Sequence, residues 1–364
     1  MFPPFWGAGT TTNALLEYFQ REAERLMRRF DATFNALMLL DPSVVAQTPA
    51  DVVYTEGKLR LLRYRPVVAQ PAATPLLIVP SVLYRYAMLD LLPGRSLVEY
   101  LVKRGIDVYL IDWGTPGPED RSVTFDHYLA GYLRRVVHQV RTRSGQEQIS
   151  MLGYGMGGTL AAIFGALHNE ELRNLITIAA PINFHDDGLL SQWTHKHRFN
   201  VDLVVDTIGA MPPALMQASF RLLKPTALIL QQMALAERCG DLEIVQDLLA
   251  LQLWLADTTP WLGEAYRTYI KECYQENYLV QGKLVVGGRR VDVGRISSAL
   301  LVVTAAKDQL CPPRSAAVLH DLVRSTDKQV LQMQGGHTSI VAGQEASQHL
   351  WPQLGDWLIA RSGS

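Results

Sequence analysis

The sequence predicts an α/β fold in which a mostly parallel sheet is flanked by helices. The first observation is that, from about residue 52, short apolar runs bounded by turn residues alternate with helical stretches. The predicted strands lie at residues 59–64, 76–79, 108–111, 149–152, 175–179, 300–304 and 330–333. Between about residues 185 and 295 helical patterns prevail, so this segment is predicted to be a helical cap inserted between two strands.

The second observation is a glycine-rich turn between a predicted strand at residues 148–152 and a predicted helix at residues 159–164. The turn reads Gly153-Tyr154-Gly155-Met156-Gly157-Gly158. This arrangement is typical of the nucleophile elbow of the α/β-hydrolase fold, where small residues allow a strained turn that lifts one Ser or Cys side chain above the sheet. The central residue here is Gly155, so the nucleophilic side chain is missing.

The same turn also fits the dinucleotide-binding pattern G-x-G-x-x-G. Such a unit would require an acidic residue at the end of the next strand. The next predicted strand, at residues 175–179, is followed by Ala180 and Pro181, and the acidic Asp186 and Asp187 come later. We therefore favour the elbow over a dinucleotide site.

Two residues near the C-terminus supply the third observation. Asp308 follows the predicted strand at 300–304, and His337 follows the predicted strand at 330–333. In α/β-hydrolases the catalytic residues come in the chain order nucleophile, acid, histidine. A carboxylate fixes the tautomer and orientation of the imidazole, whose other nitrogen can then take a proton from the nucleophile.

Composition excludes several classes of protein. The 364 residues hold 34 Lys and Arg against 35 Asp and Glu, so no global charge favours nucleic acid as a partner. Cys239, Cys273 and Cys311 are widely spaced and odd in number, which argues against a disulfide framework or a zinc site and indicates a reducing cytoplasm. Residues 1–6 do not begin a secretory signal, and no apolar run reaches the ~18 to 20 residues of a membrane span.

We expect four segments along the chain: an N-terminal helical segment (1–50), the first part of the hydrolase core (51–184), the helical cap (185–295) and the second part of the core (296–364). Apolar residues at helical spacing between residues 13 and 40 predict an amphipathic helix. That helix packs either on its own domain or against a partner subunit or a hydrophobic granule. Within the cap, helices are predicted at residues 189–193, 215–230, 242–255 and 266–278.

Beyond these patterns, nearly the whole chain resembles the polyhydroxyalkanoate synthases, specifically the short catalytic subunit of the two-subunit, class III type. The segments that carry the resemblance, besides the elbow, lie at residues 58–64, 86–91, 94–101, 105–114 and 288–292. The absence of a long N-terminal domain before the predicted sheet favours the two-subunit type.

The resemblance implies an acyltransferase whose elbow cysteine attacks the thioester of a 3-hydroxyacyl-CoA, releases CoA and carries the growing polyester. A thiolate suits this chemistry because it is a strong nucleophile. The resemblance places the nucleophile at Gly155, the acid at Asp308 and the histidine at His337. It also places one oxyanion donor at the backbone N–H of Met156. A second donor would be Val82 or Ser81, because Pro80 has no N–H.

The resemblance further implies an accessory synthase subunit and a homodimer as partners, and a location in the cytoplasm or on the surface of polyester granules. Neither a cofactor nor a metal is expected. No other side chain is expected to replace the missing cysteine: Ser150 lies within a strand, Thr159 lies on the helix past the turn, and nothing in the motif directs Cys311 toward His337.

Three hypotheses for the function remain open. The first is a polyhydroxyalkanoate synthase scaffold that is inactive, or nearly so, because the nucleophile has been replaced by Gly155. The second is a natural non-catalytic homologue that binds acyl-CoA or polyester, or that pairs with an active synthase. The third is an esterase or thioesterase in which His337 activates water.

Two smaller clusters have competing interpretations. An aromatic and polar cluster in the cap either forms cap core or lines a tunnel for the acyl or pantetheine group. Its members are Trp254, Asp257, Trp261, Tyr266 and Tyr269. The second cluster consists of His195, His197, Asp186 and Asp187. It fits no standard metal site and is interpreted as a solvated loop.

Overall fold

The computed structural model describes residues 21, 45–223 and 257–363. Residues 45–223 and 254–364 form one compact unit, and residues 1–44 with 224–253 are grouped as a second. Apart from Arg21, the second unit lies outside the described residues, as do the predicted helices at 13–40 and 242–255, the end of the helix at 215–230, Cys239 and Trp254.

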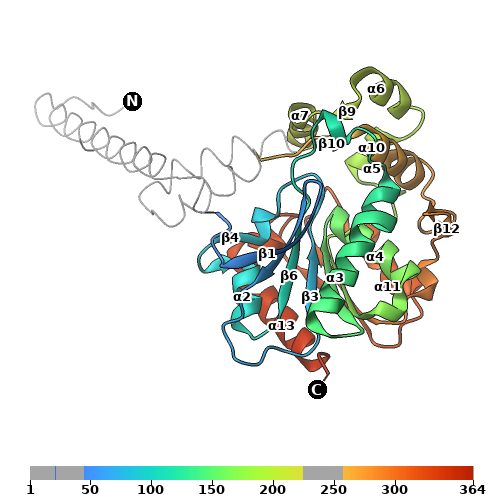
Figure 1. Cartoon of the computed structure of the whole chain (residues 1–364). Helices are drawn as coiled ribbons and strands as arrows, with labels where there is room; N and C mark the ends of the chain where they lie inside the picture. The colour runs from blue at the N-terminus through green and yellow to red at the C-terminus, as the bar shows by residue number, and fades with distance from the viewer. Residues whose placement is uncertain (1–20, 22–44, 224–256, 364) are drawn as a thin grey trace, which may run out of the picture. The chain divides into compact units, whose positions relative to one another are not determined.

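An eight-stranded sheet forms the centre of the described unit (Figure 1). Its strand order is β1-β2-β6-β3-β7-β8-β13-β14. The bounds are β1 Ala50–Glu56, β2 Leu59–Tyr64, β3 Leu76–Val79, β6 Val108–Asp112, β7 Ile149–Tyr154, β8 Leu172–Ile178, β13 Ala299–Ala305 and β14 Lys328–Met333. Strands β1, β2 and β6 pair antiparallel, and all the pairs from β6 to β14 are parallel. The structure thus confirms the predicted, mostly parallel sheet and all seven predicted strands.

The strands in the middle of the sheet are mostly apolar because helices cover both faces. Every residue of β3, β6 and β7 is buried. In Figure 1, α2 (Leu97–Lys103) and α13 (Trp351–Ala360) lie on one side of the sheet, and α3 (Arg134–Ser144), α4 (Met156–Leu167) and α11 (Pro313–Leu322) lie on the other. The edge strands β1 and β14 are mostly exposed or half-buried, and their sequences are correspondingly more polar.

The described parts of the segment between β8 and β13 are mainly helical and gather beyond one end of the sheet (Figure 1). Its described elements include α5 (Leu189–Thr194), α6 (Val201–Ile208), α7 (Pro213–Leu223), α10 (Gly263–Thr268) and the π-helical turn η6 (Tyr269–Gln275). The predicted helices at 189–193 and 266–278 correspond to α5 and to α10 with η6. Helix α6 and strand β1 were not predicted.

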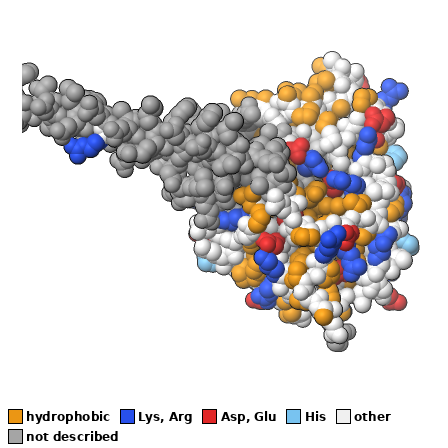
Figure 2. Space-filling view, turned by 60° about the vertical axis from the view of Figure 1, so that its left-hand side comes forward, with side chains coloured by type: hydrophobic (Ala, Val, Ile, Leu, Met, Phe, Trp, Pro, Cys, Tyr) orange, Lys and Arg blue, Asp and Glu red, His pale blue; other side chains and the backbone are white. Residues whose placement is uncertain are grey.

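The surface of the described unit carries both signs of charge. On the face shown in Figure 2, basic and acidic side chains lie interspersed with apolar ones. Among the described residues, no helix combines the length and the hydropathy that a membrane crossing would require.

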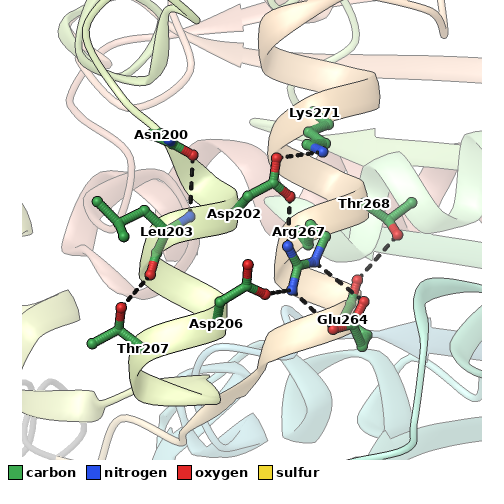
Figure 3. A network of polar contacts seen from close by, with 9 residues as sticks. All are labelled: Asn200, Asp202, Leu203, Asp206, Thr207, Glu264, Arg267, Thr268 and Lys271. Atoms are coloured by element: carbon green, nitrogen blue, oxygen red, sulfur yellow. Dashed lines mark hydrogen bonds and ion pairs between the residues drawn. The ribbon is translucent and has the colours of Figure 1, made fainter.

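Helix α6 is tied to α10 and η6 by a network of ion pairs centred on Arg267 (Figure 3). The guanidinium of Arg267 contacts Asp202 Oδ1 at 2.5 Å and Asp206 Oδ1 at 2.6 Å. Lys271 Nζ lies 2.6 Å from the other Asp202 oxygen. Because a planar guanidinium presents several donors in a fixed geometry, one Arg side chain can hold two carboxylates of α6 at once.

We expect Arg267→Ala to loosen α6 more than it destabilises the whole protein. The carboxylates are largely exposed and screened by solvent, so the network contributes little to the stability of the whole protein, and its loss should make local opening of α6 a few fold faster. Hydrogen exchange followed by mass spectrometry would show faster exchange at residues 201–208. Arg267→Lys is the matched control and should give an intermediate rate. Unchanged exchange in Arg267→Ala would contradict the role assigned to this network.

Candidate active site

The turn between β7 and α4 has the backbone geometry of an elbow. Gly155 has φ 56° and ψ −127°, a conformation that residues with a side chain rarely adopt. Its N–H donates to the carbonyl of Ile178 at 2.9 Å, and its own carbonyl accepts from the N–H of Gly158 at 2.9 Å. The backbone turn is therefore formed in full although the residue at its centre has no side chain.

Close packing at Gly157 explains why small residues follow the turn. A Cβ at this position would overlap the carbonyl oxygen of Val79 and would lie 2.6 Å from that of Pro80. The N-terminus of α4 can approach the end of β3 only because Gly157 has no side chain.

Asp308 and His337 are brought together by the ends of two neighbouring parallel strands. Asp308 follows β13 and His337 follows β14. Nδ1 of His337 lies 2.7 Å from Oδ2 of Asp308. The carboxylate side chain is fully buried, whereas the imidazole is 19 % exposed. Because an ionised carboxylate only accepts hydrogen bonds, this contact places the proton on Nδ1 and leaves the lone pair on Nε2.

Backbone and aromatic contacts hold this pair in place. The N–H groups of Leu310 and Cys311 both donate to Oδ1 of Asp308 at 2.9 Å. The hydroxyl of Tyr154 donates to the carbonyl oxygen of His337 at 3.2 Å, and the two rings lie 5.2 Å apart. Sequence reasoning did not single out Tyr154, because nothing in the order of residues shows that the elbow strand contacts the histidine loop.

The imidazole points toward the centre of the elbow. An ideal Cβ built on Gly155 would lie 3.4 Å from Nε2 of His337. A nucleophilic side chain at this position would therefore meet the nitrogen that carries the lone pair. The structure thus brings together Gly155, Asp308 and His337, the three positions that sequence reasoning joined.

The predicted oxyanion donors differ in their placement. Met156 is the first residue of α4, where N–H groups have no partner within the helix, and it lines the cavity beside Gly155. Val82 is buried and is not among the cavity-lining residues, whereas Ser81 is. The carbonyl of Val82 accepts a hydrogen bond from Thr259 at 2.7 Å. The Met156 and Val82 donors stay predictions.

A cavity of about 430 Å³ opens at the elbow and is lined mainly by apolar and aromatic side chains. Gly155, Met156 and His337 form part of its wall. The cap supplies another part of the wall, which includes Trp193, Phe199, Val204, Trp261, Tyr266 and Tyr269. Apolar cavities with few polar groups are typical of small-molecule sites.

The described cysteines are buried and free. Burial, followed by the nearby charge of Asp308, raises the pKa of Cys311 well above its ordinary value. Burial also raises the pKa of Cys273. Cys311 lines the cavity, but its thiol is protonated at neutral pH and is a poor nucleophile.

One cluster of polar side chains outside the cavity has the composition of a metal site. In the described residues, His168, Glu170 and Glu171 could approach a common metal ion. Arg134 and Arg141 contact the Glu171 carboxylate at 2.6 and 3.1 Å, and their positive charge disfavours a cation there.

The second predicted cluster, Asp186 and Asp187 with His195 and His197, makes contacts with its own backbone and with α11. Asp186 accepts from the N–H of Gly188 at 2.7 Å, and Asp187 pairs with Arg314 at 2.6 Å. The rings of His195 and His197 lie 5.2 Å apart. Each aspartate thus already has a partner.

Comparison with known proteins identifies the family. Residues 14–101 match the poly-beta-hydroxybutyrate polymerase (PhaC) N-terminus, residues 85–210 match the alpha/beta hydrolase fold, and residues 260–362 match the PHB depolymerase C-terminus. The chain is 35 % identical to the poly(3-hydroxyalkanoate) polymerase subunit PhaC of Allochromatium vinosum, over 99 % of this chain and 100 % of that protein. The chain belongs to the PhaC family of poly(3-hydroxyalkanoate) polymerases.

A second PhaC relative supports this assignment, and solved structures support the fold. The PhaC subunit of Synechocystis is 35 % identical over 88 % of this chain and 87 % of its own length. The monoacylglycerol lipase of Paleococcus ferrophilus superposes with a TM-score of 0.51 at 14 % identity, covering 84 % of this chain and 100 % of the lipase. An esterase from Thermogutta terrifontis gives 0.52 at 16 % identity, covering 87 % and 100 %. These neighbours confirm the α/β-hydrolase fold.

We expect the two described cysteines to resist alkylation in the folded PhaC-type chain. Their burial and the raised pKa of each thiol leave little thiolate. Iodoacetamide at pH 8 followed by peptide mapping should label Cys273 and Cys311 only after denaturation. Rapid labelling of Cys311 in the native protein would instead show a reactive thiol at the wall of the cavity.

Proposed function

We propose that this chain is a PhaC-type acyltransferase scaffold that binds 3-hydroxyacyl-CoA beside His337 but does not polymerise it. The observation that supports the proposal is the alignment of the Asp308–His337 pair with the centre of the elbow, where Gly155 offers no nucleophile. The base and its orienting carboxylate are in place, and the group that they would activate is missing.

The cavity supports an acyl group as the ligand. Its mainly apolar wall suits a short alkyl chain, and the Met156 N–H at the start of α4 is available to the thioester oxygen. Loss of the nucleophile from a triad enzyme lowers the rate by about 10⁴ to 10⁶. Any polymerisation by the glycine form is therefore expected to be near background.

The family also suggests the setting in which the protein acts. PhaC relatives are named as subunits of a polymerase. We propose an accessory synthase subunit as partner, a homodimer, and a cytoplasmic location on polyhydroxyalkanoate granules. The boundaries of the N-terminal segment (1–50), the two core parts (51–184 and 296–364) and the cap (185–295) are part of the same proposal.

Restoring cysteine should restore acyl transfer. In Gly155→Cys the new Cβ fits 3.4 Å from His337 Nε2, so the thiol gains its general base. With 3-hydroxybutyryl-CoA and an accessory subunit, polymer formation and CoA release should rise by at least about 10⁴-fold over the parent chain. The variant should also be less stable by about 1 kcal/mol, because Gly155 has a positive φ.

The double variant Gly155→Cys/His337→Gln is the control and should lose the restored activity. Calorimetric titration of the parent chain with 3-hydroxybutyryl-CoA measures binding separately. Binding without transfer by the folded cysteine variant would favour a non-catalytic homologue that binds acyl-CoA. If neither binding nor transfer is found, the proposal is wrong.

A further inference from the structure

The space beside the base is shaped by glycine rather than by a side chain. The position that a Cβ of Gly155 would occupy is 3.4 Å from Nε2 of His337, and no other atom outside the neighbouring residues is as close to it as the imidazole. Both residues line the cavity. The Cβ position itself is one bond length from the Gly155 Cα, so water cannot occupy it. The cavity beyond it holds no side chain of residue 155, and a water molecule there can come within hydrogen-bonding distance of Nε2.

We propose that His337 uses this space to activate water, and that the chain hydrolyses the thioester of a bound 3-hydroxyacyl-CoA without a covalent intermediate. The inference rests on the proposed function, because it requires the same substrate in the same cavity. It adds an activity that depends on glycine at residue 155.

The step is balanced within the site. Nε2 of His337 takes a proton from water while the water oxygen bonds to the thioester carbon, and the carbonyl oxygen becomes an oxyanion next to the Met156 N–H. The carbon–sulfur bond then breaks, and the imidazolium returns the proton to the sulfur of CoA. The products are one 3-hydroxy acid and one CoA thiol. Asp308 stabilises the imidazolium between the two transfers.

Nearby side chains are poor alternatives to water. The hydroxyl of Thr159 donates to the carbonyl of Pro181 at 2.7 Å, so it is engaged away from the imidazole. The pKa of Cys311 is raised by burial, and its thiol stays protonated. General-base activation by a positioned side chain contributes about 10² to 10⁴-fold, so the hydrolysis is slow compared with covalent catalysis but measurable.

The test uses the full-length chain with 3-hydroxybutyryl-CoA in ¹⁸O-labelled water. We expect CoA release at about 10²-fold or more above the uncatalysed rate, one ¹⁸O atom in each 3-hydroxybutyrate, and no acyl adduct in the intact mass of the protein. His337→Gln should abolish the excess rate.

The matched steric variant is Gly155→Ala. Its methyl group, 3.4 Å from Nε2, narrows the space for water beside the imidazole without adding a nucleophile, so hydrolysis should fall by about tenfold or more while 3-hydroxybutyryl-CoA still binds. Gly155→Cys distinguishes covalent catalysis from direct attack by water, because the acyl group of the substrate should then be found attached to the protein.

The outcomes distinguish this inference from the proposed function. If the parent chain binds 3-hydroxybutyryl-CoA in a calorimetric titration but does not release CoA above background, hydrolysis is excluded and the binding scaffold stands. If binding is absent, both fail. Hydrolysis that persists in His337→Gln, or an acyl adduct on the glycine form, would overturn direct attack by water.

Discussion

The hydrogen bond between His337 Nδ1 and Asp308 Oδ2, 2.7 Å long, is the contact on which the proposed chemistry of this molecule depends. The two residues are 29 positions apart in the sequence, and only the parallel pairing of β13 with β14 brings them together. The fully buried carboxylate is compensated by the N–H groups of Leu310 and Cys311 and by the imidazole. The carboxylate held in this way fixes the orientation of the His337 imidazole. In that orientation Nε2 faces Gly155.

The elbow is formed without a side chain at its centre because backbone packing specifies its shape. Gly157 lies against the carbonyl groups that end β3, and the N–H of Gly155 is bonded to the carbonyl of Ile178 at the end of β8. A side chain at the centre of such a turn carries backbone strain of about 1 to 3 kcal/mol. Glycine avoids that strain, so the residue that stabilises this turn is also one that offers no side chain for covalent chemistry.

The bounds of the central strands could be predicted from the sequence more accurately than those of the edge strands. Strands β2 and β3 match the predicted bounds because their apolar runs end sharply at turn residues. Strand β8 begins three residues before the predicted start, since Arg173 and Asn174 interrupt its hydropathy; Asn174 is nevertheless buried and donates to Ser150 of β7 at 2.9 Å. The polar edge strand β1 has a weak pattern. Helix α6 is amphipathic, but its 8 residues are too few to establish a helical period from the sequence.

The same limits apply to the site. Chain order and the strand-end positions were enough to select Asp308 and His337, because the ends of parallel strands meet at one edge of a sheet. Tyr154 was not predicted because it acts through a contact between segments that are distant in the sequence.

The aromatic residues Trp261, Tyr266 and Tyr269 were expected either to form cap core or to line a tunnel. They are buried against one another, with the ring centroids of the two tyrosines 5.0 and 5.3 Å from that of Trp261, and they also line the cavity. Since this wall makes no use of a side chain at residue 155, the proposed recognition of an acyl group does not depend on a nucleophile at the elbow, and the two functions are separable in this fold.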